Sequence, residues 1–153
     1  DRHALHVLNT ILGGSMSSRL FQHIREDRGL AYAVFSSLAM YSDTGMLMIY
    51  AGCANERLAE VVDLSLQELR ELRSDNVPEQ ELRRAKDHLK GSLMLGLEST
   101  SSRMTSLARQ EIYFDRQFDL DETLSGVSSV TTKARARAAP ARWRISARPA
   151  SAK

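Results

Sequence analysis

Three side chains in the segment HIRED have the types, and nearly the spacing, of a zinc site. His23 and Glu26 match two positions of the inverted zinc motif H-x-x-E-H, but Asp27 stands where the second histidine belongs. His23 and Asp27 are four residues apart and would share a helical face. A catalytic zinc normally takes three protein ligands, and no third ligand is visible in the sequence. We therefore interpret these residues as ordinary polar side chains of a helix surface.

The remaining candidates do not form a self-contained active site. His3 and His6 lie three residues apart with no carboxylate close by, and Cys53 has no histidine near it in sequence. The sequence contains no nucleophile elbow, P-loop or dinucleotide-binding glycine pattern. Cys53 is the single cysteine, so an intramolecular disulfide is excluded and a packed thiol is expected. These residues alone predict no catalysis by the chain.

Composition indicates a soluble globular protein. The chain has 153 residues, of which 42% are hydrophobic and 26% charged, and this is enough for one domain with a core. No apolar run approaches the ~20 residues that span a bilayer, and no basic stretch followed by an apolar core marks a signal peptide. We expect a cytoplasmic protein with no membrane contact. Because it lacks an initiator Met, we also expect it to begin within a longer protein.

Residues 133–153 differ in composition from the rest of the chain. They hold seven basic residues and no acidic one, so the remainder carries 14 basic against 19 acidic side chains. The Ala/Arg/Pro/Ser bias leaves little to bury and predicts a disordered tail. A nucleic-acid-binding arm would also be basic, but it would interleave more aromatic residues. We favour an out-of-frame or degenerate terminus and expect no nucleic-acid partner.

The elements that must position any site begin with two helices. A leucine stripe predicts a helix over 2–12, which two glycines end. Ser17 can cap a second helix over 18–28. Gly29 should stop this helix, because glycine takes the left-handed conformation without a steric clash.

The next segments predict an antiparallel hairpin. Residues 30–41 and 46–53 are rich in aromatic and β-branched side chains that alternate, with the turn SDTG between them. On the first strand this alternation places Tyr32 on the same face as Val34 and Ser36.

Further helices follow the hairpin. Asn55 can cap a helix that carries a leucine stripe, and Pro78 stands at the start of the next helix. The polar run Ser99–Ser102 should interrupt the helical pattern, and residues 119–131 predict one more short helix. The order indicates an α+β fold in which helices cover one face of an antiparallel sheet. Because a lone hairpin is marginal in water, we expect further strands from beyond both ends of the chain or from a partner domain.

Two segments resemble a known family. The segments SSRLFQHIREDRGLAY and VPEQELRRAKDHLKGSLMLGLESTSSRM are similar to the C-terminal-type domain of the pitrilysin/insulinase/mitochondrial processing peptidase family of zinc metallopeptidases. The resemblance covers about residues 1–131. It implies an incomplete peptidase domain over 1–132, which would form one half of a chamber, followed by the tail 133–153.

The resemblance also implies roles for two residues. In this family the C-terminal-type domain contributes an Arg and a Tyr, spaced seven apart, that contact the substrate, and this spacing falls on Arg25 and Tyr32. The Tyr hydroxyl would donate to the oxyanion during peptide-bond hydrolysis, and the Arg would bind a substrate carbonyl or hold the Tyr. Without the resemblance, these residues would be interpreted as a solvated helix residue and a packed aromatic.

The zinc motif of the family is absent, so we expect no hydrolysis by this chain alone. Zn²⁺ would be held by an N-terminal-type partner domain, in the same parent chain or in another subunit, and the substrate would be a peptide. Two alternatives remain at this point. The chain is a catalytically inactive scaffold subunit of the same family, or it is a truncated product without function.

Overall fold

The computed structural model describes residues 2–41, 43–74 and 77–132, so the predicted tail 133–153 lies outside the described residues. Its elements follow the predicted order of helices and strands. In sequence they are α1 (Arg2–Leu12), the π-helix η1 (Phe21–Glu26), β1 (Ala31–Met40), β2 (Gly45–Cys53), the 3-10 turn η2 (Asn55–Arg57), α2 (Leu58–Ser74), α3 (Glu79–Gly96), α4 (Thr100–Phe114) and α5 (Leu120–Ser129).

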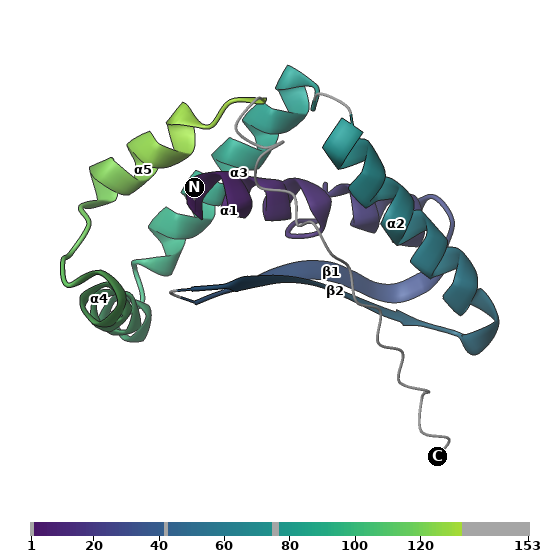
Figure 1. Cartoon of the computed structure of the whole chain (residues 1–153), viewed down its shortest axis with the longest axis horizontal. Helices are drawn as coiled ribbons and strands as arrows, with labels where there is room; N and C mark the ends of the chain where they lie inside the picture. Colours follow the sequence, from purple (N-terminus) through teal and green to yellow (C-terminus); the bar gives the residue numbers. More distant parts are fainter. Residues whose placement is uncertain (1, 42, 75–76, 133–153) are drawn as a thin grey trace, which may run out of the picture.

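The two strands form the antiparallel hairpin that the sequence predicts. Helices lie over one face of this sheet, and in the view of Figure 1 no described helix or strand lies over its other face. On the covered face Val34 and Ser36 of β1 are buried. On the open face the rings of Phe35 and Tyr50 stack across the two strands, 5.0 Å apart, and each stays nearly half exposed. The fold is therefore α+β, with helices on one face of an antiparallel sheet, as expected.

The core lies between the covered face of the sheet and the helices. Leu12, Leu20 and Ile24 are its largest fully buried side chains, contributed by α1 and by the segment of η1. The end of α1 approaches β1 closely, because Ser36 donates its backbone N–H to the Gly13 carbonyl at 3.0 Å. A Cβ at Gly13 would lie 2.7 Å from the Ser36 hydroxyl oxygen, so this approach requires glycine.

Helix ends agree with the sequence in some places and differ in others. Ser99 caps α4 by accepting the backbone N–H of Ser102, which confirms the predicted interruption. The predicted cap at Asn55 is wrong, because Ala54 occupies the N-cap and no side chain makes a cap hydrogen bond there. The predicted cap at Ser17 is also wrong. The helix begins at Arg19, directly after Ser18, and the Ser17 hydroxyl lies 3.2 Å from that of Ser15.

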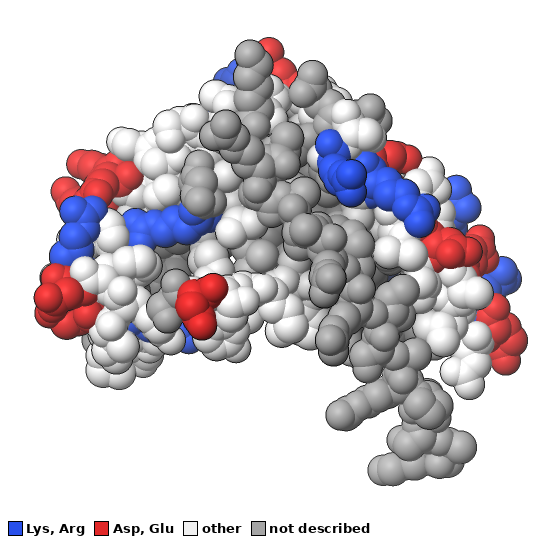
Figure 2. Space-filling view, in the orientation of Figure 1, with Lys and Arg blue, Asp and Glu red and all other residues white. Residues whose placement is uncertain are grey.

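Charged side chains are distributed without a single-sign patch on the face seen in Figure 2. They gather over α2 at one end and around α4 and α5 at the other, with both signs interspersed at each end. The hairpin contrasts with these helices, because Asp43 is the only charged residue of the sequence between Arg28 and Glu56. The strands thus present an uncharged surface beside charged helices.

Candidate functional site

The helical segment that carries Arg25 is wider than an α-helix. Over Phe21–Glu26 it is a π-helix, and the backbone N–H of Asp27 donates to the Gln22 carbonyl, five residues back, at 2.8 Å. The sequence predicted an ordinary helix, which hydrophobic periodicity alone cannot distinguish from a π-turn. Single π-turns inside helices are frequent at functional sites.

Gly29 ends this segment as predicted. Its φ is +60°, in the left-handed region, and its N–H donates to the Arg25 carbonyl at 3.1 Å. The next N–H, of Leu30, reaches the carbonyl of the fully buried Ile24 at 2.9 Å. This cap reverses the chain immediately before β1 begins, so the glycine sets the direction in which the strand leaves the helix.

Arg25 lies on the outer side of η1. Its side chain is 44% exposed, its guanidinium lies over the Phe21 ring at 4.8 Å, and its Nε is 3.8 Å from a carboxylate oxygen of Glu26. Both neighbours belong to its own helical segment and leave much of the guanidinium in solvent. A cation held in this way remains available for hydrogen bonds to an incoming carbonyl.

Tyr32 does not share the face of Val34, contrary to the predicted alternation. The strand register steps from Ala31 opposite Cys53 to Ala33 opposite Gly52, which leaves Tyr32 as the extra residue of a β-bulge. A bulge shifts the phase of a strand and re-aims a side chain. As a result Tyr32 is 73% exposed, whereas Val34 is 5% exposed.

The Tyr32 ring lies against Gly52 of β2, where a Cβ would be 2.6 Å from its hydroxyl oxygen. Neither this contact nor those of Arg25 joins the two side chains. The structure thus brings Arg25 and Tyr32 to the two flanks of the Gly29 turn. That both reach one substrate atom stays a prediction.

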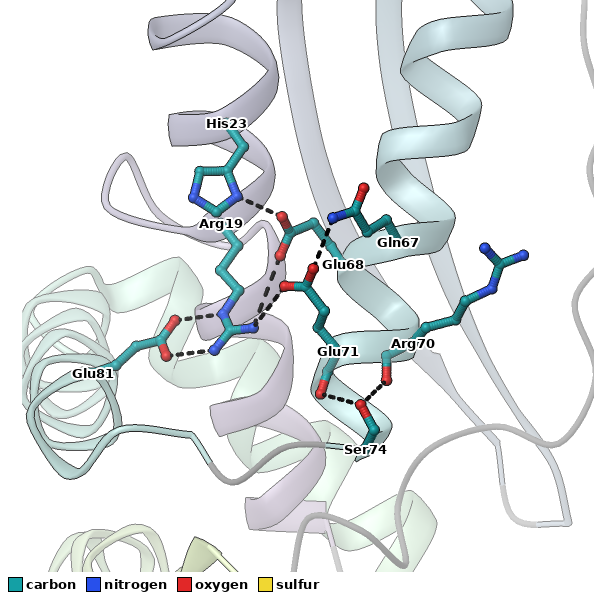
Figure 3. Close-up of polar contacts among 8 residues, drawn as sticks. All are labelled: Arg19, His23, Gln67, Glu68, Arg70, Glu71, Ser74 and Glu81. Carbon is teal, nitrogen blue, oxygen red and sulfur yellow. Dashed lines mark hydrogen bonds and ion pairs between the residues drawn. The ribbon is translucent and has the colours of Figure 1, made fainter.

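A cluster of charged side chains, shown in Figure 3, contacts the helical segment of η1, and the sequence alone gives no sign of it. Glu68 of α2 is almost fully buried, and one of its oxygens shares a hydrogen bond with Nδ1 of His23. Its other oxygen has no hydrogen-bond partner among the residues that the structure describes and lies 3.9 Å from the guanidinium of Arg19. Arg19 and His23, four residues apart, therefore both face one buried carboxylate.

Arg19 is held mainly by α3. Two of its nitrogens donate to the two carboxylate oxygens of Glu81, each at 2.8 Å. This hydrogen-bonded pair raises the pKa of the Arg19 guanidinium above its usual value, against the opposing effect of burial. The cluster joins the segment of η1 to α2 and α3 in one network, which fixes the base of the segment that carries Arg25.

The near-match to a zinc motif does not form a metal site. His23 is turned to Glu68, and Glu26 is the neighbour of Arg25. Within the described residues, no group of three or more His, Cys, Asp or Glu side chains is placed to hold a metal ion. The donor set of this part of the chain does not fit zinc.

A cavity of about 600 Å³ opens between α1, α3, α4 and α5, away from the predicted pair. His3 and His6 line it, and desolvation is the largest cause that lowers the pKa of each imidazole. Arg2 also lines it, with its guanidinium 3.8 Å from the centre of the Phe118 ring. Neither Arg25 nor Tyr32 lines this cavity, so it is not part of the candidate site.

No helix among the described residues is long and apolar enough to cross a membrane.

Comparison with curated proteins finds zinc proteases. The chain is 45% identical over 132 residues to an uncharacterized zinc protease of Mycobacterium tuberculosis, an alignment that covers 86% of this chain and 30% of that protein. It is 44% identical over 126 residues to an uncharacterized zinc protease of Bacillus subtilis, with 82% of this chain and 31% of that protein covered. The chain therefore spans about a third of the length of these relatives.

Comparison with solved structures finds the same fold. The peptidase M16 inactive domain from Pseudomonas fluorescens has a TM-score of 0.79 and 26% identity, and the match covers 90% of this chain and 33% of that one. A conserved protein from Enterococcus faecalis has a TM-score of 0.77 at 26% identity, with 90% and 32% covered. Residues 1–89 also match the family described as the peptidase M16 inactive domain. The chain thus belongs to the M16 peptidase family, as its C-terminal-type, inactive domain.

Proposed function

We propose that this chain forms one wall of a zinc metalloendopeptidase and supplies Arg25 and Tyr32 to the peptide substrate. The observation that carries the proposal is the way the chain presents this pair. A π-turn, a left-handed glycine and a β-bulge follow one another over Phe21–Tyr32, and both side chains emerge exposed. Irregular backbone of this kind is over-represented next to active sites.

The two residues would perform different tasks. Attack of water on a peptide carbonyl turns the carbonyl oxygen into an oxyanion, and the Tyr32 hydroxyl can donate a hydrogen bond to it without ionising. The guanidinium of Arg25 offers several N–H donors and can donate to a neighbouring substrate carbonyl, which holds the peptide in register. Tyr32 would then act mainly in the transition state, whereas Arg25 would act mainly in binding.

Zinc in the intact enzyme would lower the barrier to attack by water. Because the described residues of this chain do not fit a zinc site, we propose that a zinc-bearing partner domain holds the ion, in the same parent protein or in another subunit. The relatives are named zinc proteases, and the chain covers about a third of each. This leaves room in such a protein for a second domain.

The proposal is tested by combining the chain with a zinc-bearing domain of this family and measuring hydrolysis of an internally quenched peptide. Tyr32→Phe should lower kcat by about 10²–10³-fold, the loss typical for one oxyanion donor, with KM little changed. Tyr50→Phe is the matched control, because Tyr50 is an exposed tyrosine on the open face of the same hairpin. A Tyr32→Phe variant with the turnover of the parent would show that the proposal is wrong.

An interaction subunit without catalysis is the second candidate. It is favoured by the family description, which calls the domain inactive, and by the uncharged open face of the hairpin. Under this function the chain would bind a partner domain with an affinity that does not depend on Arg25 or Tyr32. Pull-down with the Arg25→Ala/Tyr32→Ala double variant distinguishes the two: equal binding with no hydrolysis by the parent complex would favour the interaction subunit.

A further inference from the structure

The ring of Tyr32 lies against Gly52, a residue that has no side chain. A Cβ at position 52 would lie 2.6 Å from the Tyr32 hydroxyl oxygen and 2.7 Å from its Cε2, and its three nearest atoms all belong to the Tyr32 side chain. Non-bonded carbon atoms prefer ~3.5–4.0 Å. The ring of Tyr32 and a side chain at position 52 therefore cannot occupy this place together.

Backbone conformation does not explain the glycine. Gly52 lies within β2, opposite Ala33, and its φ is not in the left-handed region that Gly29 adopts. An alanine would fit this backbone, since every residue type adopts extended geometry. What glycine provides at position 52 is the absence of a side chain on the open face of the sheet.

We propose that Gly52 is a positioning residue for Tyr32. The β-bulge turns the tyrosine onto the open face, and Gly52 leaves space for the ring to lie along β2, so the two features together set where the hydroxyl stands. This inference rests on the proposed role of Tyr32 in hydrolysis. It adds that Gly52, which has no reactive group and lies 20 positions further along the chain, determines where the Tyr32 hydroxyl lies.

The exposure of Tyr32 makes the inference testable without unfolding the protein. Because the ring is 73% exposed, it can swing into solvent when a methyl group takes its place. Gly52→Ala should therefore displace the ring and leave the hairpin intact. Gly91→Ala is the matched control, because a Cβ at Gly91 in α3 meets no atom within 4 Å.

The first experiment follows the ring itself in the 153-residue chain. Tyrosine rings are labelled with ¹³C, and the Tyr32 signal is assigned by its loss in Tyr32→Phe. We expect Gly52→Ala to move the Tyr32 ring resonances and to remove their contacts with residue 52. The Tyr50 resonances should keep their positions in Gly52→Ala, and the Tyr32 resonances should keep theirs in Gly91→Ala. Unchanged Tyr32 resonances in Gly52→Ala would overturn the inference.

The second experiment measures kcat in the complex with a zinc-bearing domain. A displacement of about 1 Å can cost ~10²-fold in rate, so we expect Gly52→Ala to lower kcat by about that factor while KM changes little. In the Tyr32→Phe background the same substitution should change kcat less than about twofold, because the hydroxyl that it displaces is already absent. Equal losses in the two backgrounds would indicate a merely structural glycine and overturn the inference.

The two experiments separate the inference from the proposed function. If Tyr32→Phe lowers kcat and Gly52→Ala does not, the role of Gly52 is wrong and the role of Tyr32 stands. If Tyr32→Phe has the turnover of the parent, the proposed function is wrong and Gly52 has no catalytic group to position. In that case the NMR measurement still decides whether Gly52 sets the position of the Tyr32 ring.

Discussion

The elements up to residue 89 and the helix α4 both carry large apolar side chains, but in opposite surroundings. In the first region Leu12, Leu20 and Ile24 are fully buried. In α4 no residue is buried, and Ile112 is 77% exposed. The match to the M16 inactive-domain family also ends at residue 89. The comparison shows that an apolar stripe defines what a helix can bury, while a facing surface decides whether it does.

The proposed site belongs to the packed region. Ile24 anchors η1 in the core, one residue before Arg25, and Glu68 holds the same segment from α2. A pair of exposed side chains can keep a defined geometry when the backbone that carries them is fixed by buried neighbours. The comparison therefore predicts that stability and site geometry depend on the first region and hardly on α4.

The largest effect should come from Ile24→Ala in the core. It removes a fully buried side chain and leaves a cavity, so the free energy of unfolding should fall by about 2–5 kcal/mol, whereas Ile24→Val should cost about 0.5–1.5 kcal/mol. Urea denaturation followed by circular dichroism measures both. Equal losses in the two variants would mean that η1 is not packed as described.

A smaller loss is expected from Glu68→Ala. The substitution takes the buried acceptor from His23, but Arg19 keeps Glu81, so we expect about 1–3 kcal/mol. Glu60→Ala is the control, because Glu60 is an exposed carboxylate of the same helix, 3.9 Å from Arg28, and its loss should stay below about 0.5 kcal/mol. If both variants denature alike, the cluster does not fix η1.

Stability should also fall at mildly acidic pH. In the folded chain the pKa values of His3 and His6 lie below their usual value of 6.5, with desolvation as the largest cause. Below about pH 6.5 the unfolded chain therefore binds more protons than the folded chain. The stability that the two neutral imidazoles contribute is present above about pH 6.5 and is lost as the pH falls through the lower folded-state pKa values. The His3→Gln/His6→Gln variant should show a weaker decrease in urea midpoint between pH 7 and 5. An unchanged pH profile would contradict the prediction.

The smallest effect should come from Ile112→Ala in α4. Its side chain is 77% exposed, so the free energy of unfolding should change by less than about 0.5 kcal/mol. This is the same kind of truncation as Ile24→Ala, which makes the two variants a direct comparison of the regions. A loss above 2 kcal/mol would mean that α4 is covered in solution, and the contrast between the regions would disappear.

Much of the fold could be predicted from local sequence signals. The hairpin follows from alternating β-branched and aromatic residues around a turn, and the interruption before α4 follows from Ser99, whose side chain caps the next helix. Gly29 stops η1 for the same kind of local reason. The predicted caps at Ser17 and Asn55 are wrong, because several polar residues near a helix start can accept its first N–H groups and the tertiary contacts decide which one does.

The candidate site was predicted less completely. Arg25 and Tyr32 were found through the resemblance to a family, and the structure adds the space at Gly52 that the Tyr32 ring occupies. The expected face of Tyr32 was wrong, because a single extra residue in the strand register changes the phase of the alternation without changing its pattern. Glu68 was missed, because a glutamate on an amphipathic helix gives no local sign that distant residues will bury it.

The sequence by itself determined the order of helices and strands, the glycine that ends η1 and the residue types of the proposed pair. These features depend on interactions between near neighbours in the chain, which the sequence contains directly. Only the tertiary structure decided that η1 widens into a π-helix, that Glu68 is buried beneath it, and that the Tyr32 ring lies on Gly52. Each of these depends on the space left between segments distant in sequence, and close packing rather than local preference fixes that space.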